Sequence, residues 1–266
     1  MSRDQDKRYV QVLLKPLAKC AAYTPAFGRS GPSVKSVEDF QRVYSIDPLY
    51  HWIGLDSPLM YAAHKAAGGM TSVYRQLGIG CERLFRAVIQ DTLELSDDHV
   101  KWGYDIEKKG GEKAHLELDA KIDRTNIEGE SQKRLDGFIQ GAAKALKIDT
   151  RKVKLTGAVF EVRQGYKSAD SKRQNGDLRS ATHAYTEGYL PVMAVFSTQM
   201  SQVVARRYRN AQMLVLTGTK GGTEFDSTFQ FCKNVVGYSL ADFFERNHKH
   251  LRDEFTKVLE SLLSPS

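Results

Sequence analysis

The sequence predicts an α/β protein with a central mixed sheet flanked by helices, a helical N-terminal part and a helical C-terminal tail. After residue 150, apolar runs of strand length alternate with amphipathic stretches of helix length, which is typical of an α/β core. The segment 114–123 alternates strictly between apolar and polar residues, which indicates a strand. The segments before residue 95 and after residue 238 show helical periodicity.

Length and composition describe a chain that can bury one large core. Its 266 residues are 41% hydrophobic, which favours a single domain over 1–266. Within it we expect a mostly helical subregion (1–70), an α/β core (71–224) and a helical tail (225–266). The net charge of +7 is compatible with an anionic partner such as nucleic acid, without requiring one. Because no run of 18 apolar residues occurs, we expect no membrane partner.

The cysteines give an expectation about the compartment. Cys20, Cys81 and Cys232 are far apart and form no CxxC pair. This pattern argues against a zinc site and against a disulfide framework. The first residues, MSRDQDKRYV, lack the apolar core of a signal peptide. We therefore expect a protein of the reducing cytoplasm.

Three helices are expected in the first part of the chain. SVEDFQRVYSID has apolar residues at helical spacing, and Ser36 can cap its start. SPLMYAAHKAAGG has the same character and is expected to end at Gly68–Gly69. GCERLFRAVIQDTLEL carries an apolar stripe along one helical face. Both tryptophans, Trp52 and Trp102, are expected to be partly buried packing residues.

Two strands carry the acidic residues of interest. AHLELDAKID (114–123) is predicted as one strand, with Asp119 and Asp123 on its polar face. KVKLTGAVFEVRQ (152–164) has an apolar centre that favours a central place in the sheet. The other expected elements are helices at 130–147, 177–189 and 201–210, strands at 190–198 and 211–218, and a tail helix at 239–263 capped by Ser239.

The end of the second strand brings a carboxylate next to cations. If the strand continues, Glu161, Arg163 and Lys167 share one face. A second acid from a neighbouring strand, Asp119 or its alternative Asp123, could join Glu161 on one hard cation such as Mg²⁺. Such an ion polarises a phosphate and lowers the pKa of a bound water. The competing interpretation is an ordinary strand end with solvated charges.

Residues after Glu161 are suited to contact nucleic acid. Cationic side chains bind phosphates, and Arg, Gln and Asn can also contact base edges. We predict a DNA-binding set made of Arg163, Gln164, Tyr166, Lys172, Arg173, Gln174, Asn175 and Arg179.

The string EVRQGYKSADSKRQNGDL, from Glu161 to Leu178, resembles a motif of type II restriction endonucleases of the PD-(D/E)XK superfamily, in the group related to BbvCI, BlpI and DdeI. The resemblance implies a restriction-endonuclease-like core and a prokaryotic, Mg²⁺-dependent enzyme. Such an enzyme cuts duplex DNA at a specific site and leaves a 5′-phosphate. It also implies that Glu161 and Lys167 are catalytic, and that Glu82, on the helix before the first acid, assists.

The chain departs from the superfamily pattern in two places, and one of them is the long gap between the two acids, which contains the helix expected at 130–147. At the other, Arg163 stands where the common motif has its lysine. Since arginine stays protonated in proteins, we assign the activation of water to Lys167 and a phosphate-clamping role to Arg163. Cutting two strands calls for two such sites, so a homodimer is the simplest assembly and a heterodimer with a related subunit is the alternative. The competing functions are a non-catalytic nucleic-acid-binding protein and a DNA-repair nuclease.

Overall fold

The computed structural model of the protein describes residues 3–20, 23, 36–107, 111–166 and 170–263. These residues divide into two compact units, where the sequence analysis expects one domain. The first unit comprises Met1–Gly80 with Asn247–Ser266, and the second comprises Cys81–Arg246. No helix within the described ranges is both long enough and apolar enough to cross a membrane.

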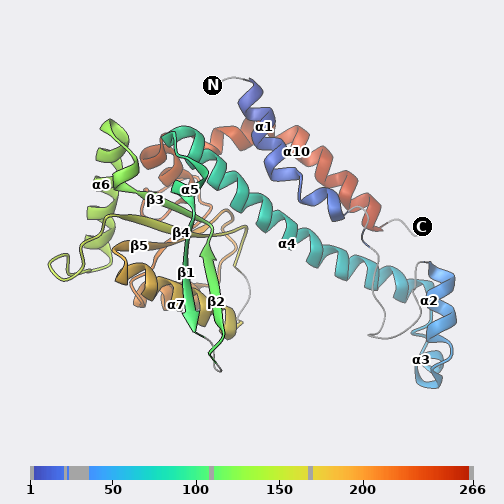
Figure 1. Ribbon diagram of the computed structural model, residues 1–266. Helices are drawn as coiled ribbons and strands as arrows, with labels where there is room; N and C mark the ends of the chain where they lie inside the picture. The colour runs from blue at the N-terminus through green and yellow to red at the C-terminus, as the bar shows by residue number, and fades with distance from the viewer. Residues whose placement is uncertain (1–2, 21–22, 24–35, 108–110, 167–169, 264–266) are drawn as a thin grey trace. The chain divides into compact units, whose positions relative to one another are not determined.

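The first unit is built from helices (Figure 1). They are α1 (Arg3–Leu14), the short 3₁₀ helix η1 (Leu17–Cys20), α2 (Val37–Tyr44), α3 (Pro48–Trp52), the first part of α4 (Pro58–Leu93) and the last part of α10 (Leu240–Leu263). One small core joins Leu17, Val73 and Leu262. The expected cap of α2 is confirmed, since the backbone N–H of Asp39 donates to Ser36 Oγ at 3.2 Å.

Helix α4 does not end at Gly68–Gly69, so that prediction is wrong. The helix runs without interruption through both glycines to Leu93. A Cβ atom at Gly68 would overlap the Tyr23 hydroxyl, and one at Gly69 would overlap the Leu262 side chain. The glycines therefore permit close packing within the helical unit, and this contact outweighs their cost in helix propensity of about 1 kcal/mol each.

The second unit contains a four-stranded mixed sheet in the order β3-β4-β5-β6. These strands are β3 (Ala120–Asp123), β4 (Gly157–Arg163), β5 (Tyr189–Val195) and β6 (Leu214–Leu216). β3 is antiparallel to β4, whereas β4, β5 and β6 are mutually parallel. The mixed α/β sheet expected from the sequence is confirmed, with β4 in an inner position.

The remaining elements of this unit flank the sheet (Figure 1). A hairpin of β1 (Trp102–Glu107) and β2 (Lys113–Leu118) forms a separate two-stranded sheet. The helices of the unit other than α4 and α10 are α5 (Asp97–Val100), the 3₁₀ helix η2 (Arg124–Asn126), α6 (Gly129–Ala145), α7 (Ser171–Thr186), α8 (Gln202–Asn210), α9 (Thr228–Phe231) and the π-helical turn η3 (Cys232–Val236). The expected strand at 114–123 is thus two strands, β2 and β3, with a bend at Asp119 between them.

The two faces of the sheet carry different cores. On one face, Phe160 of β4 packs against Phe85 and Phe231, with ring centroids 5.2 Å away in each case. On the other face, a core of Met193, Val195 and Val215 packs with residues of α7 and α8. Glu161 lies beside Met193 in the parallel register, so it points toward the α7–α8 face.

Candidate active site

The structure brings Asp119 and Glu161 together on neighbouring strands. The register pairs Ala120 with Phe160, and the N–H of Asp119 donates to the Phe160 carbonyl at 2.9 Å. The N–H of Val162 donates to Asp119 Oδ2 at 2.6 Å, which fixes the carboxylate against β4. The two acids therefore sit side by side at the C-terminal end of β4, the end at which open α/β sheets bind ligands.

Asp123 is not the partner of Glu161. It lies opposite Gly157 at the other end of β3, about 13 Å along the strand from Asp119 at the usual rise per residue. Its carboxylate accepts hydrogen bonds from the Tyr189 hydroxyl at 2.5 Å and from the N–H of Thr125 at 2.9 Å. These bonds give Asp123 a structural role at the start of η2. The alternative prediction, in which Asp123 shares a metal ion with Glu161, is therefore wrong.

Helix α4 supplies two more charged groups to the same place. Arg86 Nε donates to the Asp119 carbonyl oxygen at 2.7 Å and so stabilises the bend between β2 and β3. Glu82 lies one turn earlier on the helix, with its Oε1 3.9 Å from Arg86 Nη2. The carboxylate of Glu82 also raises the pKa of both Asp119 and Glu161. Glu82 therefore acts on the acid pair electrostatically, and its role in catalysis stays a prediction.

The negative charge around the acid pair is only partly offset. Burial is the largest cause that raises the pKa of Asp119, followed by repulsion from Glu161 and Glu82. Burial also raises the pKa of Glu161, and Asp177 and Glu82 add to it, although Arg163 opposes the shift. Crowded, buried carboxylates bind protons or cations more readily than solvated ones because either restores neutrality.

Arg163 is the cation closest to this group. Its Nη2 forms an ion pair with Glu161 and lies 3.5 Å from Asp177 Oδ1. Burial alone would lower the pKa of Arg163, but the three neighbouring carboxylates outweigh burial and raise it. Its Nε is buried and has no hydrogen-bond partner among the described residues. The guanidinium thus has one unused donor, but this nitrogen is buried, whereas the Arg163 side chain as a whole is 26% exposed beside the acid pair.

A buried polar network supports Arg163 from behind. Asp177 Oδ2 accepts hydrogen bonds from the hydroxyls of Tyr166 at 3.0 Å and Tyr208 at 2.6 Å. Because these hydroxyls are held by the carboxylate and buried, the pKa of Tyr208 is raised, mainly by burial. Tyr166 is therefore a core residue, and its predicted contact with DNA is wrong.

Helix α7 carries the other residues of the predicted DNA-binding set. Gln174 is buried and accepts a hydrogen bond from Arg207 Nη1 at 2.7 Å, so it does not reach a ligand. Asn175 is exposed, and its Oδ1 accepts a hydrogen bond from Arg207 Nη2 at 2.6 Å, which joins α7 to α8. The prediction for Gln174 is corrected by its burial and by its contact with Arg207 of α8.

The exposed cations of α7 fit the expectation better. Lys172, Arg173 and Arg179 are all exposed on this helix. Lys172 and Arg179 are about two turns apart and therefore share a face. Gln164 is half-buried just beyond β4. Lys167, the expected catalytic lysine, lies outside the described residues.

The two tryptophans differ from each other. Trp102 is buried on β1, and its Nε1 donates to Glu187 Oε2 at 2.9 Å, which confirms its packing role. Trp52 is 78% exposed, so the same prediction is wrong for it.

Three residues of the site were not singled out from the sequence. Arg86 follows Glu82 at i, i+4 on one helix, and this spacing could have suggested the pair. Asp177 lies inside the string 161–178, but an acid among cations reads as a solvated charge. Tyr208 is distant in sequence, and only the packing of α8 against α7 brings it to Asp177.

The protein has no significant match to a protein-family model, to a curated protein or to a solved structure. Within the described ranges, no group of three or more His, Cys, Asp or Glu side chains is arranged as a ready metal site.

Proposed function

We propose that the protein is a Mg²⁺-dependent type II restriction endonuclease that hydrolyses duplex DNA at a specific site and leaves a 5′-phosphate. The observation that carries this proposal is the pair Asp119–Glu161. Two partly or fully buried carboxylates lie side by side, short of counter-charge, at the C-terminal end of an inner strand. Cations of α7 follow in the chain at once.

The residues present fit a hard divalent cation. Mg²⁺ commonly takes one or two protein carboxylates and completes its octahedron with waters and substrate phosphate oxygens. Asp119 and Glu161 supply two such carboxylates. Their raised pKa values reflect burial and repulsion between carboxylates, and a bound cation would relieve that repulsion. When bound there, Mg²⁺ would polarise the phosphate and make a water molecule more acidic.

The chain's own groups would position the substrate around that pair. Arg163, whose side chain is 26% exposed, can donate to a phosphate oxygen, while Asp177 keeps the guanidinium in place. Lys172, Arg173 and Arg179 can bind the sugar–phosphate backbone on either side. In this proposal Lys167 orients the attacking water and accepts or relays its proton, and Glu82 holds Arg86 and, through it, the bend at Asp119.

A nucleic-acid-binding protein without catalysis is less compatible with this geometry. Carboxylates near phosphates repel them, so a pure binder gains nothing from placing Asp119 and Glu161 next to a basic helix. A repair nuclease would use the same chemistry on damaged or branched DNA. Cleavage of intact duplex at a defined sequence distinguishes the proposed function from repair.

The test separates chemistry from binding. Plasmid DNA should be cut to discrete fragments with Mg²⁺ and left intact with excess chelator. Glu161→Gln should abolish cutting while binding of the same duplex in Ca²⁺, measured by gel shift, is kept or tightened, because one phosphate-repelling charge is gone. Cleavage that persists in chelator, or binding lost in a folded Glu161→Gln protein, would refute the role assigned to the acid pair.

A further inference from the structure

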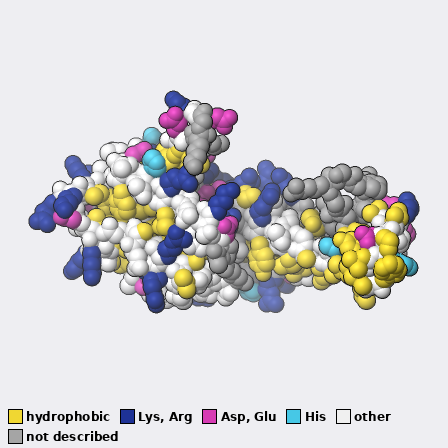
Figure 2. All heavy atoms as spheres, turned by 90° about the horizontal axis from the view of Figure 1, so that it is seen from below, with side chains coloured by type: hydrophobic (Ala, Val, Ile, Leu, Met, Phe, Trp, Pro, Cys, Tyr) yellow, Lys and Arg dark blue, Asp and Glu magenta, His cyan; other side chains and the backbone are white. Residues whose placement is uncertain are grey.

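The segment around α3 exposes six large apolar side chains, of which Tyr50 is the least exposed at 37%. Trp52 is 78% exposed, Ile46 77% and Leu59 83%. With Leu49 and Ile53, which are also exposed, they form a set that we call the apolar tip. Figure 2 shows hydrophobic side chains gathered into one continuous area over the α2–α3 region. Clusters of this kind on a protein surface mark interaction sites more often than single exposed apolar residues do.

The apolar tip is not needed to attach α2 and α3 to their own unit. That task falls to a different set of side chains on the inner side. Phe40 and Tyr61 are buried there, and their rings lie 5.6 Å apart. Tyr44 adds to this cluster, with its ring 4.2 Å from that of Phe40. The inner apolar side chains therefore pack within the chain, whereas the apolar tip is exposed in the part of the chain that the structure describes.

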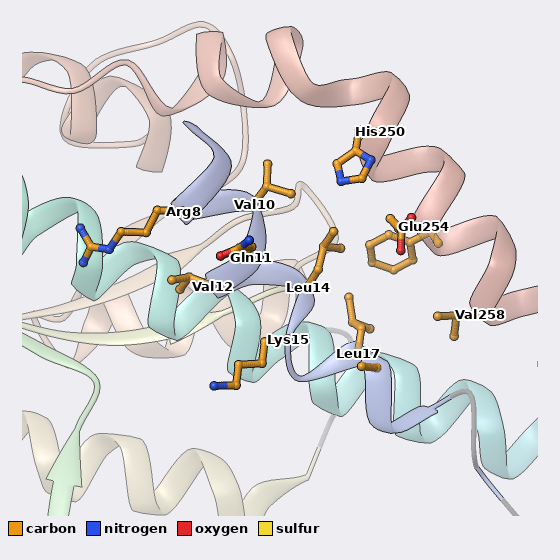
Figure 3. Close-up of a pocket in the computed structure, with 12 residues that line it drawn as sticks. Arg8, Val10, Gln11, Val12, Leu14, Lys15, Leu17, His250, Glu254 and Val258 are labelled. Atoms are coloured by element: carbon orange, nitrogen blue, oxygen red, sulfur yellow. The ribbon is translucent and has the colours of Figure 1, made fainter. Parts of the chain in front are cut away.

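The same unit contains a groove of about 650 Å³ between α1–η1 and α10. Figure 3 shows Val10, Leu14 and Leu17 on one side, with Val258 on the opposite helix. These residues give the groove an apolar interior. A volume of this size holds a few large side chains or one drug-sized molecule.

The edge of the groove is predominantly basic. Arg8, Lys15 and His250 line it and are exposed. The acid that lines it, Glu254, is paired with Lys257 at 2.6 Å.

The apolar tip has the opposite charge around it. Asp47 caps α3 and is exposed. Asp56 contacts His51 at 2.7 Å, and Glu38 and Asp39 stand at the start of α2. Arg42 offsets one of these acids. Tip and groove are thus complementary both in apolar character and in charge.

We propose that the protein forms a dimer in which the apolar tip of each chain inserts into the groove of a second copy. Each chain carries one tip and one groove, so a reciprocal exchange about a two-fold axis uses both surfaces and closes the assembly. The acids around Trp52 would face Arg8 and Lys15 of the other chain. The observations that support this inference are independent of the proposed nuclease function. If the protein is a nuclease, a dimer would provide two acid pairs, one for each DNA strand.

The experiment uses substitutions at exposed positions, where the fold tolerates change. Trp52→Arg replaces the largest side chain of the apolar tip by a cation, which would repel Arg8 and Lys15 of the other chain. Ala18→Arg places a long cation at an exposed position that lines the groove. Val203→Arg is the matched control, since Val203 is 79% exposed on α8, outside both surfaces. Circular dichroism and thermal melting establish that each variant is folded.

Sedimentation velocity should show a dimer for the wild-type chain and for Val203→Arg. Trp52→Arg and Ala18→Arg should each raise the dissociation constant of self-association at least 100-fold. In a mixture, the intact tip of the Ala18→Arg chain still fits the intact groove of the Trp52→Arg chain. The mixed pair should therefore associate at least ten-fold more tightly than either variant with itself.

Three results would overturn the inference: a monomeric wild-type chain at tens of micromolar, open polymers instead of a dimer, or a mixed pair no tighter than the self pairs. The last of these would indicate contact between two tips instead. Because the readout is mass and needs no cleavage, a monomer that still cuts DNA refutes only the dimer. A dimer that never cuts DNA refutes only the proposed function.

Discussion

Replacing Asp119 by asparagine should stabilise the protein at alkaline pH, although it removes a residue of the proposed active site. Burial, together with Glu161 and Glu82, raises the pKa of Asp119 to about 9. A carboxyl group with a raised pKa favours the folded state at low pH, and this advantage is lost as the pH rises through the folded-state value. The wild-type chain should therefore lose stability between about pH 4 and pH 9, whereas Asp119→Asn should not.

The size of the effect follows from the shift and from the surroundings. One pKa unit corresponds to about 1.4 kcal/mol, but Asp119 is partly exposed and Arg163 offsets some of its charge. We expect Asp119→Asn to raise the free energy of unfolding by about 2 kcal/mol at pH 9, or the melting temperature by roughly 4–8 °C. The amide oxygen can still accept the N–H of Val162, so that hydrogen bond is kept.

The assay is chemical denaturation of both proteins between pH 4 and pH 9 in chelator. Asp123→Asn is the matched control with the opposite sign. Burial alone would raise the pKa of Asp123, but hydrogen bonds from Tyr189 and Thr125 outweigh it and lower the pKa. Its stabilisation is present above the unfolded-state pKa and lost as the pH falls, so Asp123→Asn should destabilise at neutral pH. Equal destabilisation of both variants at pH 9 would refute charge crowding at Asp119.

Three further predictions address the residues around the acid pair. Lys167→Ala should lower the single-turnover cleavage rate about 100-fold with little change in DNA affinity, whereas Arg163→Lys should weaken binding and keep some cleavage; the reverse result would move the water-positioning role to Arg163. Tyr208→Phe should destabilise the protein by about 1 kcal/mol and lower the cleavage rate. The control is Tyr185→Phe, which loses a hydrogen bond to the Gln212 carbonyl instead and should leave the cleavage rate unchanged. Lys172→Ala should reduce the slope of the logarithm of the DNA-binding constant against the logarithm of salt concentration by about one counterion. An unchanged slope would show that Lys172 of α7 does not contact DNA phosphates.

The sequence was most informative where local pattern and burial agree. β4, β5, α8 and β6 lie where the apolar runs and amphipathic stretches predict them, because inner strands between covering helices need continuous apolar residues. The position of Glu161 at the end of β4 follows directly from that strand. The choice between Asp119 and Asp123 could not be made in the same way. It depends on the register between β3 and β4 and on the bend that Arg86 stabilises.

Burial of polar and aromatic residues was the main source of error. Tyr166 and Gln174 stand among cations and amides, and only their contacts with α8 show that they are core residues. Trp52 was expected to be partly buried because of its size, yet it is 78% exposed. Gly68 was expected to end a helix, and its role depends on Tyr23, which is distant in sequence. Each of these outcomes is decided by a partner that local sequence does not contain.

The ion pair between Arg163 and Glu161 has a consequence for the choice of ion. A guanidinium remains charged at any physiological pH, so Glu161 already has a monovalent partner tethered to its own strand. Sodium or potassium offers the carboxylate no more charge than this arginine does, and must also give up part of its hydration shell. A divalent ion brings twice the charge and can engage Asp119 as well. In the proposed function, the arginine would thereby favour a divalent ion over a monovalent one at the acid pair.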